Sequence, residues 1–429
     1  MNTEKEILQG LARIIDPDFQ KDIVSLGFVK NIAIKGETVS LEIELTTPAC
    51  PVKETFQSEA EEILKGLGFR GIEVRMTSRA PRQLQKSTRL QKVRTIIAVA
   101  SCKGGVGKST TAALIARELA RRGHPTGLLD ADIYGPSVPS LFGIHDPDLT
   151  MTEDKLLKPY LVSPNFKVMS FGFLLGDSPA ILRGPMVAGY VQQLLHQVDW
   201  GELDYLVIDM PPGTGDVQLT ITQNVELSGA VIVTTHQALS LVDVAKGILM
   251  FERVNVPILG LIENMSYIEC EKCGNRTYPF GKPTASLQER FGVETLAEFP
   301  ISPDFSENFL TLKESPVVSH AVDQIARSLG KRLLEPGSRP EIENAKDKIT
   351  FHFADKKTVS VAPRKLRLSC ACALCVDERT GKKILQESQV PDSIHALEVT
   401  PIGNYAVGIR WSDGHSSGIY PYKTIREMG

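Results

Sequence analysis

The spacing of hydrophobic residues changes along the chain and divides it into three regions. The first 78 residues combine apolar positions three or four apart, which predict helices, with shorter apolar runs of strand character. The predicted helices span 6–15 and 52–67, and the predicted strands span 23–34, 38–45 and 71–76. Asp16-Pro17 should end the first helix, because a residue before proline avoids the helical region. We therefore expect a small α+β domain over residues 1–78.

The middle of the chain, residues 95–334, alternates short apolar runs with helical patterns. Its predicted strands are 95–100, 126–129, 205–210, 230–235 and 258–262. Such alternation is typical of an α/β fold, in which helices cover both faces of a mostly parallel sheet. Functional groups of these folds gather where the strands end, at the carboxyl edge of the sheet.

The last region, residues 349–429, is rich in strand patterns and is predicted to be a β-rich domain. A polar linker over 335–348 precedes it, and a basic linker over 79–94 precedes the middle domain. Residues 77–95 carry six Lys or Arg and no Asp or Glu. No aromatic residue is interleaved with these charges, so a solvated linker is favoured over a nucleic-acid contact.

Composition narrows the classes of function. With 42% hydrophobic and 23% charged residues among 429, the chain can bury large cores. The net charge of −3 indicates no polyanionic partner, and no apolar run approaches the about 18 residues that a membrane helix needs. The N-terminus lacks the layout of a signal or transit peptide. We therefore expect a cytoplasmic protein without nucleic-acid or membrane partners.

A phosphate-binding loop follows the first strand of the middle domain. Residues 101–110 read SCKGGVGKST and lead at once into a helical pattern, so backbone N–H groups at a helix N-terminus can face the phosphates of ATP. Lys108 can reach the β- and γ-phosphates, and the Ser109 hydroxyl can hold Mg2+. Cys102 occupies the place of the first glycine of the usual pattern. The predicted nucleotide contacts in this loop are Cys102, Lys103, Gly104, Gly105, Val106, Gly107, Lys108, Ser109 and Thr110.

The extra lysine, Lys103, makes this loop resemble the deviant P-loop of dimeric ATPases, a group that includes partition proteins, nitrogenase iron protein and the Mrp/ApbC iron–sulfur carriers. The resemblance implies that Lys103 reaches across a dimer interface to the nucleotide of the partner. Lys103 and Lys108 are then catalytic, because phosphoryl transfer needs charge neutralisation on the transferred group.

Acidic residues follow two other strands of the same predicted sheet. Asp130 comes directly after 126–129, and Asp209 lies at the end of 205–210. An acid after an apolar run beside a P-loop is typical of the magnesium site of such ATPases. The predicted magnesium residues are therefore Ser109, Asp130 and Asp209, although an aspartate that ends a strand can also be a turn residue.

Resemblance to the Mrp family assigns further roles. It implies that Asp132, in switch I, orients or activates the attacking water and is catalytic, and that Gly213 and Asp216 belong to switch II. It also implies that Asn264, at the end of the last predicted strand, contacts the adenine base. A turn or helix-cap asparagine is the alternative for this residue.

A C-x-x-C pair, Cys270 and Cys273, stands just beyond Asn264. It supplies two of the four thiolates that zinc or a four-iron cluster takes, and a twofold dimer would supply the other two. The middle domain resembles the Mrp/ApbC family, in which the pair bridges a [4Fe–4S] cluster between subunits. The segments that carry this resemblance are KGGVGKST, LLDADIYGPSVPSLFG, YLVIDMPPGTGD and ENMSY with the cysteine pair. Half a zinc knuckle and a thioredoxin-like redox pair are the alternatives.

Three further cysteines lie in LRLSCACALCVDERTG, and a histidine follows in WSDGHSSGIYPY. Both segments resemble the amino-terminal zinc domain of γ-butyrobetaine hydroxylase. The resemblance implies a Zn2+ site on Cys370, Cys372, Cys375 and His415. Such a closed tetrahedral set is structural, and the alternative is that these cysteines help carry the cluster.

Cys50 is the one residue of the first region with metal chemistry. IIDPD, DIVSLGFV and TTPACP resemble the SufT-like domain of iron–sulfur assembly proteins. A lone cysteine is more often a small buried hydrophobe, but a place at a helix start can lower the pKa of its thiol. Cys50 is therefore an accessory candidate beside the iron–sulfur pair.

All three regions together resemble the high-chlorophyll-fluorescence branch of these carriers known from plastids. We therefore expect a homodimeric ATPase that receives a [4Fe–4S] cluster from upstream donors and passes it to recipient apoproteins. The location would be the plastid stroma for a processed plastid form. The alternatives are a partition or positioning ATPase, and a non-enzymatic metal-binding adaptor with a degenerate P-loop.

Overall fold

The computed structural model describes residues 3–78, 90–145, 147–175, 184–213, 216–235, 241–270, 272–281, 292–305, 309, 314–334, 340–353, 355–372, 374–376, 382–402 and 406–428. The chain divides into two compact units. One comprises Met1–Arg82 with Val322–Pro336, and the other comprises Gln83–Ala321 with Gly337–Gly429. Residues 79–89 and 335–339 of the two predicted linkers lie outside the described residues.

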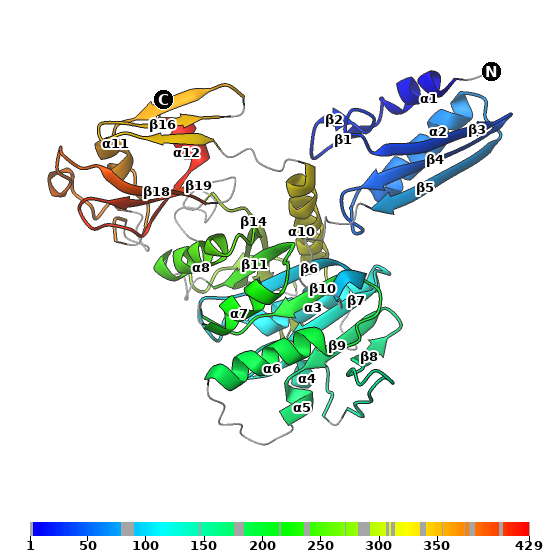
Figure 1. Ribbon diagram of the computed structural model, residues 1–429, viewed down its shortest axis with the longest axis horizontal. Coiled ribbons are helices and arrows are strands. Elements are labelled where there is room, and N and C mark those ends of the chain that lie inside the picture. The colour runs from blue at the N-terminus through cyan, green and yellow to red at the C-terminus, as the bar shows by residue number, and fades with distance from the viewer. Residues whose placement is uncertain are drawn as a thin grey trace. The chain divides into compact units, whose positions relative to one another are not determined.

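The N-terminal unit contains a three-stranded sheet with the order β3-β4-β5 and helices α1 and α2 packed against it (Figure 1). Alternate residues of β4 are buried, as the strand pattern predicts for a sheet with one covered face. Ile7 and Leu11 of α1 join Phe56 and Leu64 of α2 in its core. The elements are α1 (Glu4–Leu11), β1 (Ile15–Asp16), β2 (Lys21–Asp22), β3 (Val29–Lys35), β4 (Thr38–Leu45), α2 (Lys53–Gly66) and β5 (Gly71–Ser78).

Two of the boundaries predicted for this unit are wrong by more than two residues. The first helix ends at Leu11 rather than at residue 15, and the chain then pairs as the short strand β1. The predicted strand 23–34 is interrupted by a turn, in which the carboxylate of Asp22 accepts hydrogen bonds from the backbone N–H groups of Val24 and Ser25. Side-chain to backbone bonds of this kind stabilise turns over strands.

A nine-stranded, mostly parallel sheet lies at the centre of the other unit, which confirms the predicted α/β class. Its order among the described residues is β13-β12-β11-β6-β10-β7-β9-β8, with β14 on β12, and only the pairs β8–β9 and β12–β13 are antiparallel. The strands β8, β9, β13 and β14 were not predicted. The bounds are β6 (Val93–Ala100), β7 (Thr126–Asp130), β8 (Tyr160–Ser163), β9 (Phe166–Ser170), β10 (Leu203–Asp209), β11 (Gly229–Thr234), β12 (Ile258–Glu269), β13 (Arg276–Thr277) and β14 (Thr295–Pro300).

Helices cover both faces of this sheet. On one face, helices α6, α7 and α8 pack in one core with β6 and β10 through residues that include Val191, Ile221 and Ile248. Helix α3 contacts β6, β7 and β10. A hydrogen bond from the guanidinium of Arg122, just after α3, to the Ser319 hydroxyl joins α3 to α10. The helices are α3 (Lys108–Arg121), α4 (Val138–Leu141), α5 (Gly172–Leu175), α6 (Gly184–His196), α7 (Asp216–Asn224), α8 (Leu241–Arg253) and α10 (Pro316–Leu334), with 3-10 turns at Leu90–Lys92 and Pro303–Phe305.

The C-terminal region consists of two three-stranded antiparallel sheets around a core that contains Trp411 and the three clustered cysteines. This is the predicted β-rich architecture. Ile402, Ala406 and Ile419 of the second sheet join the core cluster that contains α8. The elements are β15 (Glu341–Asn344), β16 (Ile349–His352), β17 (Thr358–Val361), α11 (Pro363–Leu368), a 3-10 turn (Glu387–Gln389), β18 (Ala396–Ile402), β19 (Ala406–Trp411), β20 (Gly418–Pro421) and α12 (Tyr422–Arg426).

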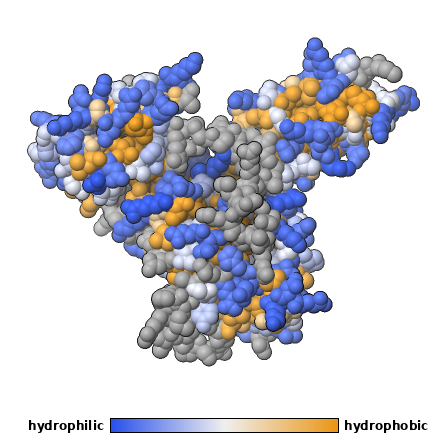
Figure 2. Space-filling model, viewed as in Figure 1, coloured by the Kyte–Doolittle hydropathy of each residue, from blue (hydrophilic) through white to orange (hydrophobic). Residues whose placement is uncertain are grey.

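The surface carries both hydrophilic and hydrophobic residues. Hydrophilic residues are spread over the face drawn in Figure 2, and hydrophobic residues gather over the N-terminal unit. Its exposed aliphatic residues include Ile15 and Ile34, at 51% and 37% exposure. None of the described helices is both long enough and apolar enough to cross a membrane.

Replacement of Gly127 by alanine should destabilise the central sheet. A Cβ atom at this buried position of β7 would lie 2.7 Å from the Trp200 ring and 2.9 Å from Leu203. Overpacking of this kind costs about 1–3 kcal/mol. Chemical denaturation followed by tryptophan fluorescence measures the loss. Gly189→Ala is the control, because its Cβ would meet nothing within 4 Å on helix α6, and it should be neutral or slightly stabilising. Equal midpoints for the two variants would contradict the prediction.

Candidate nucleotide and metal sites

The P-loop connects β6, at the middle of the sheet, to α3. Gly105 and Gly107 have φ angles of +77° and +76°, a backbone conformation that L residues rarely adopt. The Ser101 hydroxyl donates to the carbonyl of Lys103 at 2.8 Å and closes the loop at its base. The structure therefore places the predicted phosphate-binding segment at the carboxyl edge of the central strand, where ligands bind in such folds.

Cys102 packs against a helix of the same unit. A Cβ atom at Gly247 of α8 would lie 2.4 Å from its Sγ atom, so glycine at this position leaves room for the sulfur. Cys102 and Lys103 also line a small cavity with Val106 of the P-loop, Thr234 of β11 and Val244 of α8. The backbone of Gly104 and the side chain of Lys103 are exposed at the outer side of the loop.

Lys108 lies between two carboxylates that the sequence separates widely. Its Nζ atom is bonded to Asp209 and lies 3.8 Å from Oδ2 of Asp132, and it is 3.4 Å from the Ser109 hydroxyl. Lys108 and Asp209 are 6% and 0% exposed. Within the described part of the chain, Oδ1 of Asp132 and Oδ2 of Asp209 have no hydrogen-bond partner. Buried carboxylate oxygens of this kind suit a divalent cation, which prefers oxygen ligands.

Asp130 is the third acid at this edge and is fully buried. One carboxylate oxygen accepts from the backbone N–H of Asp132 at 3.1 Å, and the other accepts from the N–H of Val138 at 3.2 Å and from the Ser170 hydroxyl at 2.9 Å. Burial raises the pKa of Asp130 to about 7, the charge of Asp209 adds to the rise, and the Ser170 hydrogen bond opposes it. Burial also raises the pKa of Asp209.

Switch II is tied to the base of the P-loop. The N–H of Gly213 donates to the carbonyl of Ser101 at 2.9 Å. Gln218 of α7, which is 1% exposed, donates from Nε2 to the carbonyl of Pro211 at 2.5 Å. The side chain of Asp216, predicted for switch II, lies outside the described residues.

Asn264 joins β12 to the P-loop. Its side-chain nitrogen donates to the carbonyl of Val106 at 2.9 Å, and a Cβ atom at Gly107 would lie 2.1 Å from that nitrogen. The next residue, Met265, has a φ of +54°, and the pairing of β12 with β14 shifts register between Glu263 and Tyr267. Bulges and left-handed residues inside strands are concentrated at functional sites.

Cys270 and Cys273 are exposed at the end of this same strand. The N–H of Cys270 donates to the carbonyl of Asn275 at 2.9 Å, and the N–H of Gly274 donates to that of Cys270 at 2.8 Å, so both thiols lie in a hairpin turn between β12 and β13. Arg276 stacks over the ring of Tyr267 at 4.3 Å and supports the hairpin at its base. The pair is therefore accessible, as metal binding from outside requires.

Cys50 does not have the environment that its position in the sequence suggested. Burial raises the pKa of the Cys50 thiol to about 11, and the carboxylates of Asp16 and Asp18 contribute to the rise. The expectation that the helix start favours its thiolate is therefore wrong, because the desolvation of a buried thiol outweighs a helix terminus. Its role as an accessory ligand remains a prediction.

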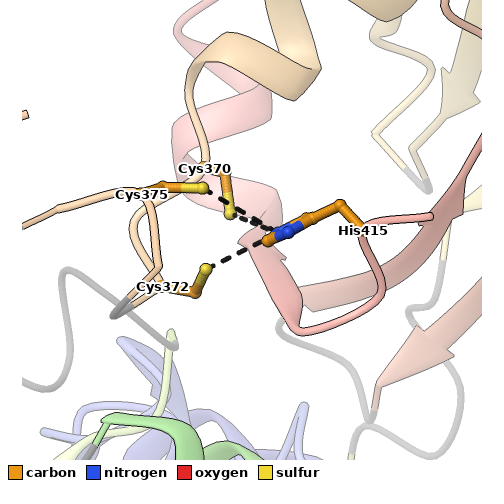
Figure 3. A group of neighbouring side chains, drawn as sticks. All are labelled: Cys370, Cys372, Cys375 and His415. Atoms are coloured by element: carbon orange, nitrogen blue, oxygen red, sulfur yellow. Dashed lines mark hydrogen bonds between the residues drawn. The ribbon is translucent and has the colours of Figure 1, made fainter. Parts of the chain in front are cut away.

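In the C-terminal region, Cys370, Cys372, Cys375 and His415 come together, as the resemblance to the zinc domain implies (Figure 3). Their ligand atoms all lie within 4.8 Å of one another. The three sulfurs lie 3.3, 3.5 and 4.0 Å from Nε2 of His415, in the order Cys370, Cys372 and Cys375. Three buried thiols with one imidazole fit a tetrahedral zinc site.

Arg367 completes the surroundings of this group and was not predicted. Arg367 is 5% exposed. Its guanidinium donates hydrogen bonds to the sulfur of Cys375 at 3.3 Å and to Asp413 at 2.8 Å. Asp413 in turn accepts from the backbone N–H of His415 at 3.0 Å. A buried positive charge beside these sulfurs would offset the negative charge that thiolate ligands carry when they bind a metal ion. An arginine three residues before the first cysteine is the only signal that the sequence offers.

Comparison with known proteins bears on all three regions. The model of the NUBPL iron-transfer P-loop NTPase family matches residues 92–332, that of iron–sulfur cluster assembly proteins matches 4–75, and that of the N-terminal region of γ-butyrobetaine hydroxylase-like proteins matches 341–426. The Fe-S cluster assembly factor HCF101, chloroplastic, of Arabidopsis thaliana is 41% identical over 99% of this chain and 83% of its own. The iron–sulfur cluster carrier protein of Synechocystis is 45% identical over 65% of this chain and 80% of its own.

Among solved structures, a nucleotide-binding protein from Archaeoglobus fulgidus in complex with ADP is 43% identical. The match covers 54% of this chain and 92% of that protein, with a TM-score of 0.48.

Glu263, beside Asn264, should make stability depend on pH. It is 4% exposed and pairs across the strands with Glu298, and burial raises its pKa to about 7. Because the fold favours the protonated form, this contribution to stability is full below the unfolded pKa of about 4.5 and is lost as the pH rises through 7. Glu263→Gln removes the charge, so its melting temperature should exceed that of the wild type by several degrees near pH 8 and by little near pH 5.

The exposed Glu153 provides the control for this measurement. Glu153→Gln should follow the wild-type melting curve at every pH. A Glu263→Gln curve that runs parallel to that of the wild type between about pH 5 and pH 8 would show that the carboxyl carries no such penalty.

Proposed function

This chain belongs to the family of iron-transfer P-loop NTPases that carry and assemble iron–sulfur clusters, and on that premise we propose that it is a homodimeric ATPase that binds a [4Fe–4S] cluster and passes it to apoproteins. The observation that supports this most directly is the position of strand β12. Asn264 on this strand touches the P-loop, and Cys270 lies at the end of the same strand. A nucleotide site and a thiol pair thus share one element.

The nucleotide chemistry assigned to this site is the hydrolysis of ATP. A water oxygen attacks the γ-phosphorus, the bond to the β-phosphate oxygen breaks, and ADP and phosphate leave. Lys108 neutralises charge on the phosphoryl group, and Asp132 orients the water or takes its proton. Ser109 and Asp209, with Asp130 behind them, would hold Mg2+, and the ion would supply neutralisation of phosphate charge. Asn264 is assigned to the adenine base.

The cluster chemistry of the proposal requires a second copy of the chain. Cys270 and Cys273 provide two exposed thiols, and a four-iron cluster takes four. A twofold axis at this hairpin would bring the same two thiols from the partner. The exposed Lys103 would then approach the nucleotide of that partner, so ATP binding and cluster binding both favour the dimer.

Strand β12 is the route by which the two events can influence each other. Cys270 is the sixth residue after Asn264, which corresponds to about 20 Å of extended chain. Met265, with its left-handed backbone, and the register shift of β12 lie directly at the P-loop. A conformational change of the P-loop would therefore displace this irregular part of β12 and, with it, the hairpin that carries Cys270. Linkage requires the effect to be reciprocal: a nucleotide that weakens cluster binding must itself bind less tightly when the cluster is present.

Lys108→Ala should abolish turnover of ATP and the nucleotide-dependent part of cluster transfer. The substitution removes the charge that meets the phosphates, while the thiol pair stays intact. A steady-state phosphate-release assay should show a loss of at least about 100-fold in kcat, as for other groups that stabilise the transferred phosphoryl charge. Transfer to an apo-ferredoxin, followed by its visible spectrum, should become independent of ATP. Unchanged turnover in Lys108→Ala would refute the ATPase assignment.

Anaerobic reconstitution with iron and sulfide tests the cluster itself. The wild-type protein should acquire about four irons per dimer, with the broad visible absorption of thiolate-to-iron charge transfer. The double variant Cys270→Ser/Cys273→Ser should lose it, while Cys102→Ser, at a cysteine that packs against α8, serves as the control and should retain it in the absence of nucleotide. Absorption and iron content that survive loss of the pair would overturn the assignment, and a partition-type ATPase would then be favoured.

For the C-terminal region we propose a structural zinc site on Cys370, Cys372, Cys375 and His415. All four positions for ligands are filled by the protein, so the ion would hold the loop 370–375 against the turn at His415 rather than act on a substrate. The buried set supports this reading over cluster transfer, since a cluster that is passed on needs access.

Metal analysis distinguishes a structural zinc site from a role of these four residues in cluster transfer. Protein purified aerobically should contain about one zinc per chain, and the zinc should remain in Cys270→Ser/Cys273→Ser. Cys372→Ser should lose zinc and lower the melting temperature, because a structural ion contributes its binding free energy to folding. Iron in place of zinc at this site, or a cluster that disappears with Cys372→Ser alone, would contradict the structural role.

A further inference from the structure

The loop that follows β7 is held at both ends by one buried carboxylate. Asp130 accepts from the backbone N–H of Asp132 with Oδ1 and from that of Val138 with Oδ2, so the two oxygens span the whole of residues 132–138. Asp132 is the residue assigned to the attacking water. Its backbone position therefore depends on how the side chain of Asp130 is oriented.

Ser170 determines that orientation. It is the last residue of β9, lies opposite Asp130 in the parallel pair β7–β9 and is 0% exposed. Its hydroxyl donates to Oδ2 of Asp130 at 2.9 Å and accepts from the N–H of Gly172 at 3.0 Å. Both the donor and an acceptor position of the hydroxyl are thus used, and the carboxylate has a partner that does not belong to the loop.

Gly172 lies close to two prolines, one within this loop and one just after it. A Cβ atom there would lie 2.9 Å from Cγ of Pro139 and 3.4 Å from Cβ of Pro136. The two prolines have restricted φ angles and rest on the glycine backbone. The segment 170–172 therefore contacts switch I by one hydrogen bond through Asp130 and by direct packing.

We propose that Ser170 is a positioning residue for ATP hydrolysis, which fixes Asp130 and, through it, Asp132 beside the attacking water. The inference rests on the proposed ATPase function. It gives β9 a role in the reaction, although β9 supplies none of the residues predicted for the nucleotide or magnesium sites. Nucleotide binding itself is assigned to the P-loop, whereas the hydroxyl of Ser170 is hydrogen-bonded to Asp130 and to Gly172.

Steady-state hydrolysis of ATP by the full-length protein tests the proposal. Ser170→Ala removes one hydrogen bond to a charged group and should lower kcat about tenfold, with KM for ATP changed less than about twofold. Ser170→Thr retains the hydroxyl and should restore kcat to within about threefold of the wild type. Should Ser170→Ala not fold, Ser170→Cys keeps the side-chain volume with only a weak donor, and the same loss of kcat is expected.

The matched control is Thr126→Val at the other end of the neighbouring strand. Thr126 is also 0% exposed, and its hydroxyl donates to the carbonyl of His124 at 2.8 Å, away from switch I. It should lower the melting temperature as Ser170→Ala does, and leave kcat unchanged.

Three outcomes would overturn the positioning role: kcat of Ser170→Ala within twofold of the wild type, an equal loss of kcat in Thr126→Val, or a loss confined to KM. Absence of turnover in the wild-type protein would overturn the ATPase function as well, so the two failures are distinguishable.

Discussion

The balance of charge around one buried lysine governs the central site. Lys108 is 6% exposed, and a charge so far from water is tolerated only beside opposite charges. Asp209 and Asp132 supply them. A triphosphate brings its own negative charge to the same lysine, so nucleotide binding must exchange ion pairs within the protein for ion pairs with phosphate. The carboxylates that lose the lysine then have oxygens for a cation and a water, which is the change that hydrolysis needs.

The same edge of the sheet connects this site to the thiol pair. In a parallel sheet all strands end at one edge, and β12 runs past that edge into the hairpin of Cys270. Its bulge at Met265 breaks the regular pairing where the strand meets the P-loop. The coupling proposed between the two sites requires an element with two arrangements, and β12 is the strand that both sites share.

The cluster of Cys370, Cys372, Cys375 and His415 has a comparable balance of charge with the signs reversed. Thiols lose their protons and become negatively charged when they bind a cation. The positive charge of Arg367, which donates a hydrogen bond to Cys375, lies beside them. Asp413 holds both Arg367 and the backbone of His415, so the ligands and the balancing charge form one network. Partners of this kind orient the ligands of a metal and tune its affinity.

The sequence by itself determined the chemistry that local motifs carry. The P-loop, the acids after two strands and the C-x-x-C pair could be named because their spacing sets their place on a strand, loop or helix start. The ligands of the C-terminal group followed from the resemblance of two segments to a known zinc domain. The parallel sheet followed from the alternation of apolar runs and helical patterns. Only the tertiary structure decided which distant residues support these groups. Ser170 reaches Asp130 because β9 pairs with β7, and Arg367 reaches Cys375 through the fold of α11. Burial decided the pKa values of Cys50 and Glu263, since desolvation depends on everything packed around a group and not on its neighbours in the sequence.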